Sequence, residues 1–393
     1  MRSVAPSPTR RYIGAMGRTR AGRGRACLGV FTTVTVAACA VGCSGHPPPV
    51  QTAAGARPVS ASFFAGDPFP ATFSVPAQPP PALPVGALSR GALVYQPCAD
   101  SDCAPYLVLA DGRQFRLAEP PTKGPRRPSL ATLSPDGRWL GQYGPRGYGL
   151  RDLASADPPR GVDGTPLTWS PDSRWLLTAL TSEGADRKYS LVEIASGAVH
   201  TVSVPPQVTV TGVLPSGDLV AVPPTPGAPS GHLALDVLDG RSGAPVRQVS
   251  ADLAPADSKY QWFYNTCCLA LAPDGRTVTV QLTWPADWDT PEAPAQRPPT
   301  VFVVVDLASG TVAHRWELFD HRQVTGRARP AEYEAWDVQR ALPSGVVLSH
   351  QRGPGGHELV LLDPASGARR VVSRAPNVYL EVPGGVLGSV VDS

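Results

Sequence analysis

The stretch LSPDGRWLG, Leu133 to Gly141, returns with small changes as WSPDSRWLL (Trp169 to Leu177) and as LAPDGRTVTV (Leu271 to Val280). Proline presets φ for the second position of a type I turn, aspartate suits the third position, and glycine adopts the left-handed backbone that follows. Each stretch therefore predicts a tight hairpin between two short strands. We expect the aspartates of these turns to be structural rather than catalytic: Asp136, Asp172 and Asp274.

Related turns recur along the chain and define a repeat. Seven anchors share the turn position: Gly91, Gly137, Ser173, Gly217, Gly275, Gly345 and Gly385. A second phrase, typified by DLASG at Asp306 to Gly310, falls between anchors and predicts a second hairpin in each unit. Two hairpins form a four-stranded blade of a radial repeat. The seven anchors favour seven blades, with six as the alternative if the last strands join the first blade.

The pattern of apolar and turn-forming residues from about Val85 onward is typical of an all-β fold. Short runs rich in valine and leucine alternate with turns of Gly, Pro, Asp and Ser, and no long stretch has helical periodicity. A regular β chain of this length must avoid exposed sheet edges, which a ring of blades achieves. We therefore predict an all-β propeller domain over residues 86–393.

The S-P-D-G and D-x-x-S-G turns, over roughly residues 87 to 390, resemble the repeat of TolB-type and other bacterial WD40-like propellers. The resemblance implies a binding or scaffolding role at the cell envelope, and it identifies no partner because this architecture hosts many functions. The Gly-His and Trp-Asp landmarks of eukaryotic WD40 repeats do not recur in register, so the peptide groove of that family is not carried over.

Residues 1–43 have the features of a secretory leader. Seven arginines and no acidic residue precede Cys27, and the apolar run CLGVFTTVTVAACAVG that follows is too short to span a bilayer. The run ends at Ala40-Val41-Gly42-Cys43, which resembles the lipobox of bacterial lipoproteins, with Ala40 where leucine is commoner. The resemblance implies lipidation of Cys43 and anchoring on the extracytoplasmic face of the cell membrane. Simple signal-peptidase cleavage is the alternative, and translation begins at Met1 or Met16.

Residues 44–85 are rich in proline and alanine, and we expect a disordered tether that holds the propeller away from the membrane. The leader contains seven of the 35 basic residues and none of the 32 acidic ones, so the remainder carries 28 minus 32, a net charge of −4. A mildly acidic chain has no long-range attraction for nucleic acid. We expect a monomer that touches the membrane only through its lipid.

Four cysteines remain beyond the anchor: Cys98, Cys103, Cys267 and Cys268. An even number in an exported chain favours disulfides. Of three possible connectivities, a Cys98 to Cys103 bridge closes the loop CADSDC and leaves either a vicinal Cys267 to Cys268 bridge or two free thiols. Neither pair has the spacing of a zinc finger.

The two recurring turn phrases should lie on one face of the ring, which places the longer connections on the other face. Long loops on a rigid scaffold commonly carry function, and Trp, Tyr and Arg anchor interfaces. We therefore predict a binding face for a protein or a cell-wall glycan, formed by nine residues: Trp262, Tyr264, Trp284, Asp287, Trp288, Asp289, His321, Tyr333 and Trp336. Packing of these rings beneath their own loops is the alternative.

No motif for catalysis is present in the sequence. It has no G-x-S-x-G elbow, no P-loop and no second histidine to complete a zincin motif after His357-Glu358. The carboxylates of Asp287-Trp288-Asp289 lack the regular spacing of a calcium loop. We predict a non-catalytic protein without cofactor or metal. An envelope enzyme of lactonase or glycan-cleaving type is the first alternative, and an accessory subunit of a transport or secretion complex is the second.

Overall fold

A computed structural model describes residues 75–96, 104–118, 131–144, 147–180, 186–223, 231–253, 263–283, 300–319, 334–342, 344–352, 356–375 and 379–381. All of them belong to one compact unit, Thr52–Ser393. Among these residues the regular structure consists of strands, and no helix long and apolar enough to cross a bilayer occurs.

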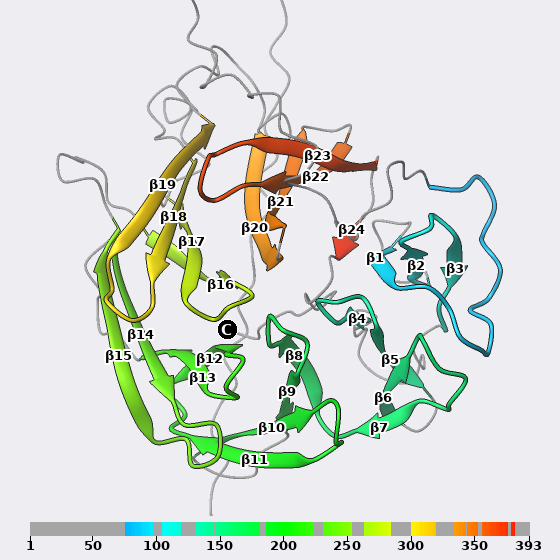
Figure 1. Ribbon diagram of the computed structural model, residues 1–393, viewed down its shortest axis with the longest axis horizontal. Helices are drawn as coiled ribbons and strands as arrows, with labels where there is room; N and C mark the ends of the chain where they lie inside the picture. The colour runs from blue at the N-terminus through cyan, green and yellow to red at the C-terminus, as the bar shows by residue number, and fades with distance from the viewer. Residues whose placement is uncertain are drawn as a thin grey trace, which may run out of the picture. The chain divides into compact units, whose positions relative to one another are not determined.

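Six four-stranded antiparallel sheets surround a common centre, so the chain is a six-bladed β-propeller (Figure 1). From the centre outward, blade 1 contains β24 (Tyr379–Glu381), β1 (Gly91–Gln96), β2 (Tyr106–Leu109) and β3 (Gln114–Arg116). Blade 2 contains β4 (Thr132–Leu133), β5 (Trp139–Gly144), β6 (Gly147–Asp152) and β7 (Arg160–Val162). Blade 3 contains β8 (Thr165–Trp169), β9 (Trp175–Leu180), β10 (Arg187–Glu193) and β11 (Val199–Val204).

The remaining blades follow the same order. Blade 4 contains β12 (Thr209–Val213), β13 (Leu219–Val222), β14 (His232–Leu238) and β15 (Pro245–Asp252). Blade 5 contains β16 (Phe263–Leu271), β17 (Thr277–Thr283), β18 (Thr300–Asp306) and β19 (Val312–Phe319). Blade 6 contains β20 (Glu334–Leu342), β21 (Gly345–Arg352), β22 (Gly356–Leu362) and β23 (Arg369–Ala375).

The ring closes through blade 1, and this corrects the expected number of blades from seven to six. The C-terminal strand β24 pairs with β1, with Tyr95 opposite Leu380. Gly91 begins the second strand of blade 1, while Gly385 follows its innermost strand in sequence. The two anchors thus flank one blade from opposite ends of the chain, and counting both gave one blade too many.

The hydrophobic core lies in the seams between neighbouring blades. Successive side chains of a strand point to opposite faces of the sheet, so each inner strand contributes to two seams. In β1, Leu93 and Tyr95 pack into the seam with blade 6, whereas Val94 packs into the seam with blade 2. All three are fully buried. This alternation explains why runs such as TVFVVVD (Thr300–Asp306) are apolar at nearly every position.

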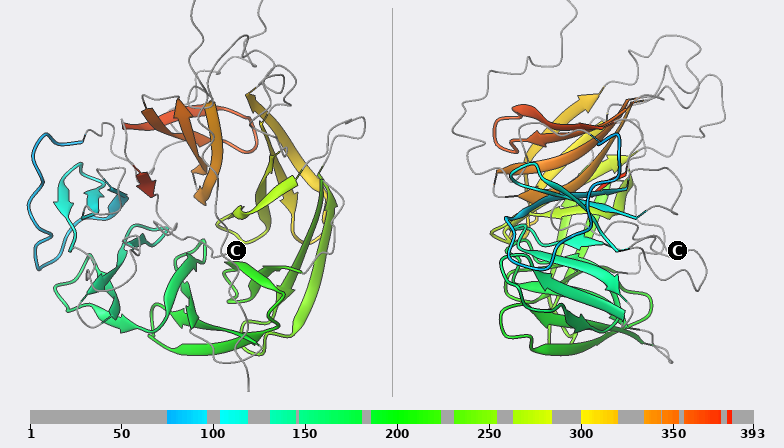
Figure 2. Two further views of the ribbon diagram at one scale, coloured as in Figure 1. Left: turned by 180° about the vertical axis from the view of Figure 1, so that it is seen from behind. Right: turned by 90° about the vertical axis from the view of Figure 1, so that its right-hand side faces the viewer.

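The S-P-D-G-type turns have the geometry that their sequences predict, whereas the anchor Gly91 begins β1 and has no positive φ. Gly137 has φ of 69°, Gly275 of 67° and Ser173 of 65°. The second phrase places Gly197 and Gly310 at φ of 74° and 71°. Both kinds of turn follow strands that run in the same direction, so they lie on one face of the ring, here called the turn face (Figure 2).

Residues 75–90, of which 75–85 fall in the segment that we assigned to the tether, lie against the outside of blade 1. Val75 packs on the seam between blades 6 and 1, and Ala82 forms a parallel bridge with Arg116 of β3. Leu83 and Leu88 pack on the seam between blades 1 and 2. The segment therefore covers the one blade that is built from both ends of the chain.

Candidate functional site

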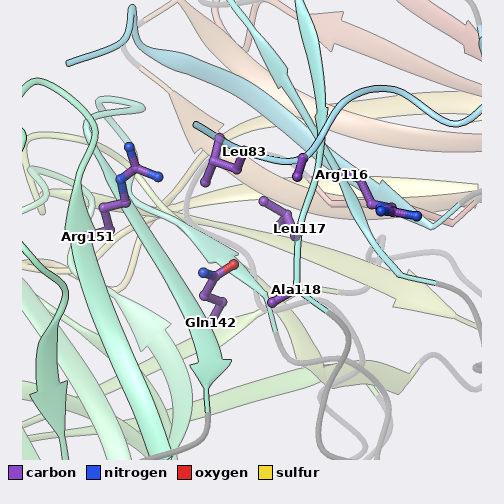
Figure 3. Close-up of a pocket in the computed structure, with 7 residues that line it drawn as sticks. Leu83, Arg116, Leu117, Ala118, Gln142 and Arg151 are labelled. Atoms are coloured by element: carbon purple, nitrogen blue, oxygen red, sulfur yellow. The ribbon is translucent and has the colours of Figure 1, made fainter. Parts of the chain in front are cut away.

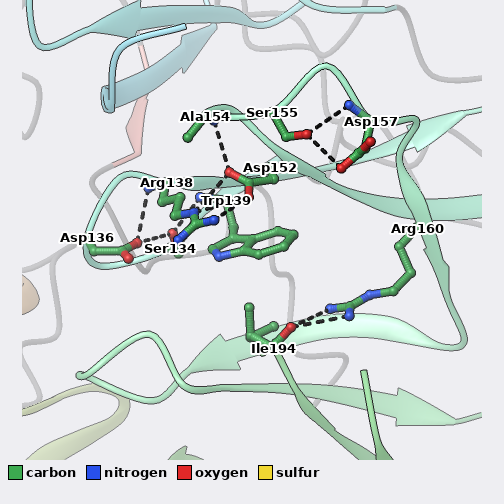
Figure 4. A network of polar contacts seen from close by, with 10 residues as sticks. All are labelled: Ser134, Asp136, Arg138, Trp139, Asp152, Ala154, Ser155, Asp157, Arg160 and Ile194. Atoms are coloured by element: carbon green, nitrogen blue, oxygen red, sulfur yellow. Dashed lines mark hydrogen bonds and ion pairs between the residues drawn. The ribbon is translucent and has the colours of Figure 1, made fainter. Parts of the chain in front are cut away.

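The turn face is held by local polar contacts (Figure 4). In the first S-P-D-G turn, Asp136 accepts hydrogen bonds from the Ser134 hydroxyl at 2.6 Å and from the Arg138 backbone at 3.0 Å. The Arg138 guanidinium donates to both oxygens of Asp152 at 2.6–3.1 Å. These bonds and the Arg138 charge hold the pKa of the Asp152 carboxyl below its usual range. The aspartates of these turns are thus engaged in turn formation.

Adjacent blades are also joined on the turn face. The Arg160 guanidinium of blade 2 donates to the Ile194 carbonyl of blade 3 at 3.2 Å, and it lies 5.6 Å from the ring centre of Trp139. Trp175 of blade 3 donates through Nε1 to the Pro215 carbonyl of blade 4 at 3.2 Å. These hydrogen bonds tie neighbouring blades together on the turn face.

The strands that bound the long connections end on the opposite face. The first-to-second strand turn of blade 2 spans only residues 134–138, whereas 284–299 separate the described parts of β17 and β18, and 320–333 separate those of β19 and β20. Seven residues of the predicted binding face belong to connections outside the described residues: Trp262, Trp284, Asp287, Trp288, Asp289, His321 and Tyr333. Tyr264 lies in β16, and its side chain is likewise outside the described part.

Trp336, whose side chain is described, lies in the core. It belongs to β20 rather than to the preceding connection, and its exposed fraction is 7%. The ring stacks on His350 with centroids 3.8 Å apart, next to Phe302 and Leu348. Trp336 therefore packs the seam between blades 5 and 6 and does not line an exposed surface.

The disulfides proposed for the four cysteines remain a prediction. Cys98 and Cys103 lie outside the described residues, and only the backbone of Cys267 and Cys268 is described, in β16. The register of β16 against β17 shifts between Tyr264 and Leu269, so the two adjacent cysteines lie within an irregular part of the strand.

A chain of hydrogen bonds that the sequence did not suggest joins His232, Ser250 and Asp252 on blade 4. His232 Nδ1 lies 2.8 Å from Asp252 Oδ1, and its Nε2 lies 2.9 Å from the Ser250 hydroxyl. His232 faces Asp252 across β14 and β15. Their neighbours Leu253 and Gly231 form the hydrogen-bonded pair, so His232 and Asp252 occupy a non-hydrogen-bonded pair, where side chains approach most closely.

Hydrogen bonds link these three residues in the same sequence as the Ser-His-Asp triad of a serine hydrolase, but their environment is different. A catalytic aspartate is buried, and the developing charge is stabilised in a site that excludes water. Asp252 is 91% exposed at its side chain, so water screens its interaction with the imidazole. We therefore interpret the trio as a surface hydrogen-bond chain. Alternation along β15 places Ser250 and Asp252 on one face, but only the register between strands brings His232 to them.

A cavity of about 380 Å³ lies between blades 1 and 2 (Figure 3). Its lining comes from the segment before β1, from the end of β3 and from β5 and β6. It consists of four small or apolar residues and three polar ones: Ala82, Leu83, Leu117, Ala118, Arg116, Gln142 and Arg151. No motif pointed to this cavity, because it depends on how the N-terminal segment docks. Among the described residues, no group of three or more His, Cys, Asp or Glu side chains is placed to hold a metal ion.

No protein-family model and no curated protein matches the sequence. Solved structures with a similar fold include a putative TolB from Agrobacterium tumefaciens, which is 14% identical, with 76% of this chain and 99% of that chain covered and a TM-score of 0.39. The periplasmic gluconolactonase PpgL of Pseudomonas aeruginosa is 18% identical, with 76% and 98% covered and a TM-score of 0.34.

The β-propeller domain of the Trilobed protease from Pyrococcus furiosus, described as having an open velcro topology, is 11% identical, with 73% of this chain and 85% of that chain covered and a TM-score of 0.38. At such identities and TM-scores the similarities concern the fold alone. The strand order itself establishes the propeller expected from the TolB-type resemblance.

Proposed function

We propose that this chain is a secreted, lipid-anchored propeller that binds a protein or a cell-wall glycan at the bacterial envelope without transforming it. The observation that carries the proposal is the asymmetry of the ring. One face consists of short turns whose polar groups are engaged by their own neighbours, and the strands bounding every long connection end on the other face. A rigid scaffold with elaborated loops on one side is the usual design of a binding module.

The aromatic composition of those connections supports a role in binding. Trp262, Trp284 and Trp288 fall within or beside acidic and proline-rich stretches of sequence. Tryptophan provides a large rigid surface for a protein interface and a stacking plane for a sugar ring. With Trp336 assigned to the core, these three tryptophans are the residues that we place at the centre of the proposed face.

The test is capture from envelope extracts by the full chain carrying a C-terminal tag, with bound proteins and glycans identified by mass spectrometry. Trp262→Ala combined with Trp288→Ala should weaken capture at least tenfold, since anchor residues contribute about 2 kcal/mol or more. Trp139→Ala, on the turn face, is the matched control and should leave capture unchanged. Equal capture by the double variant and the wild type would refute this binding face.

The anchor is tested separately. Cys43→Ser should release the chain from membranes into the soluble fraction, because the lipid requires the cysteine thiol, while capture of the partner by the released protein persists. Retention of the Cys43→Ser chain on membranes would contradict lipid anchoring and leave the binding proposal to be judged by the tryptophan variants.

A further inference from the structure

The cavity between blades 1 and 2 contains a buried positive charge without a counterion. Arg151 of β6 is 8% exposed. Its Nη2 group donates to the carbonyl oxygens of Pro84 at 2.6 Å and Gly86 at 2.9 Å. No carboxylate of the described residues forms an ion pair with it, and no described residue accepts a bond from its Nε or Nη1 group.

Burial of an unpaired guanidinium is costly. Charged groups that lose part of their hydration on burial are normally paired with a counterion. The same burial lowers the pKa of Arg151, although an arginine stays charged at neutral pH. The two carbonyl bonds hold the guanidinium in one orientation but supply no negative charge. An anion in the cavity would complete the site.

A second polar group of the cavity is also incomplete. Gln142 of β5 lines the same space, and its Oε1 atom is buried without a hydrogen-bond partner among the described residues. The oxygen and nitrogen of a glutamine amide are assigned from their partners, so rotation of the amide presents the NH₂ group instead. In that orientation Gln142 offers a hydrogen-bond donor to the same cavity that Arg151 lines.

The rest of the lining selects the kind of anion. Leu83 and Leu117 provide apolar walls, and Ala82 and Ala118 leave the space open. Arg116 lines the cavity, but in Figure 3 its guanidinium points away from Arg151. One guanidinium and one amide are too few donors for a phosphate dianion, whereas they suit a single carboxylate. The volume of about 380 Å³ lies in the range of small-molecule sites.

We propose that the cavity between blades 1 and 2 binds a small organic monocarboxylate, with its carboxylate on Arg151 and Gln142 and its apolar body against Leu83 and Leu117. This site is independent of the proposed binding face. It lies beneath the segment that connects the tether to the propeller, and Pro84 and Gly86 of that segment share the guanidinium with the ligand. Binding of the acid should therefore also stabilise the contact of Pro84 and Gly86 with blade 2.

The test is calorimetric titration of the purified full chain with benzoate, a carboxylate with an apolar body. Benzamide, which has the same shape without charge, and inorganic phosphate are the comparison probes. We expect saturable binding of benzoate and at least tenfold weaker binding of the other two, because a hydrogen bond to a charged group contributes about 1.5 kcal/mol or more. Equal binding of benzamide, preference for phosphate, or no saturable binding of benzoate overturns the proposal.

Variants locate the site. Arg151→Met should weaken benzoate binding at least tenfold. Arg160→Met is the matched control, because Arg160 also donates to a backbone carbonyl across a seam but is not among the residues that line the cavity. This substitution should leave the affinity for benzoate unchanged. If Arg151→Met does not fold, Ala118→Trp adds a large ring to the cavity lining from an exposed position and should abolish binding. Unchanged affinity in the Ala118 variant overturns the site.

One further variant tests whether the cavity binds an external acid or a carboxylate of the chain itself. Glu119 follows the lining residue Ala118 in sequence. If the wild type binds benzoate and Glu119→Gln changes the affinity less than twofold, the result supports an external ligand. Binding that occurs only in Glu119→Gln shows that the chain's own carboxylate occupies the site, and this overturns the proposal.

Discussion

At the scale of single residues, Ser173 combines a strained backbone with a hydrogen bond between two blades. Ser173 is the one residue other than glycine with a positive φ in the described part of the chain, at 65°. A left-handed conformation costs a residue with a Cβ about 1 kcal/mol or more. The Ser173 hydroxyl accepts a hydrogen bond from the Asp136 backbone of blade 2 at 2.9 Å. That bond between blades offsets the strain.

The two contributions are separable by substitution at Ser173. Ser173→Ala keeps the strain and loses the bond, so we expect its free energy of unfolding to fall by about 1 kcal/mol. Ser173→Gly loses both, and the relief of strain should bring its free energy of unfolding close to that of the wild type. Urea unfolding of the two variants measures the difference. A glycine variant less stable than the alanine variant would show that backbone strain at Ser173 is negligible.

Gly141 of β5 illustrates close packing at the residue scale. A Cβ at this position would lie 1.8 Å from the Tyr148 hydroxyl and 2.6 Å from Thr132 Oγ1. These two hydroxyls are buried and form a 2.6 Å hydrogen bond with each other. Gly141→Ala should therefore lower the free energy of unfolding by roughly 3 kcal/mol through overpacking.

Gly161 of β7 is the control for Gly141, since a Cβ added to Gly161 would meet nothing within 4 Å and its φ is not in the left-handed region. Gly161→Ala should change the midpoint of urea unfolding little. Similar losses in the two alanine variants would indicate a general intolerance of these strands to substitution, rather than the specific contact with Tyr148.

At the scale of elements, carboxylates on the turn face couple stability to pH. The Arg113 guanidinium, through its hydrogen bonds and charge, lowers the pKa of Asp111 to about 2. Arg138 lowers the pKa of Asp152 in the same manner. A folded-state pKa below the unfolded value of about 3.9 means that the unfolded chain binds more protons in acid. This contribution is complete above about pH 5 and disappears as the pH falls towards 2.

Asp152→Asn tests this coupling. The Asp152 side chain is 13% exposed and its partner Arg138 is 52% exposed, so solvent screening limits the contribution of the pair to about 1 kcal/mol. The variant should be less stable than the wild type at pH 7 by about that amount, and the difference should shrink as the pH falls below the unfolded-state pKa of about 3.9. Asp157→Asn is the control, because Asp157 lies on the same turn and forms no ion pair with a described residue. A difference that is constant with pH would exclude the ion pair as its cause.

Sequence reasoning succeeded where the physical cause is local and failed where it depends on distant pairing. The turns at Gly137 and Ser173 follow from neighbouring residues alone, so their structure was predictable. The blade number depends on β24 meeting β1, which no local pattern encodes. Burial of Trp336 depends on where β20 begins after a long connection. The cavity near Arg151 depends on docking of residues 82–86, and apolar periodicity gives no signal for it.

For the whole molecule, three residues of β24 close the ring. Their pairing with Val94, Tyr95 and Gln96 covers the inner edge of β1. An uncovered strand edge exposes unpaired backbone groups and promotes association between chains. Tyr95, which is fully buried in the seam with blade 6, adjoins this edge. Closure therefore protects both the backbone of blade 1 and the core of an adjacent seam.

Truncation after residue 378 tests this closure. Loss of β24 removes a short ladder of hydrogen bonds, each contributing about 1 kcal/mol, so we expect the free energy of unfolding to fall on the order of 3 kcal/mol and the chain to associate at high concentration. Truncation after residue 384 retains β24 and is the matched control. Because blade 1 alone is built from both ends of the chain, hydrogen exchange in the first variant should increase first in β1 and β2. Uniform exchange over all six blades would show instead that the ring unfolds as one cooperative unit.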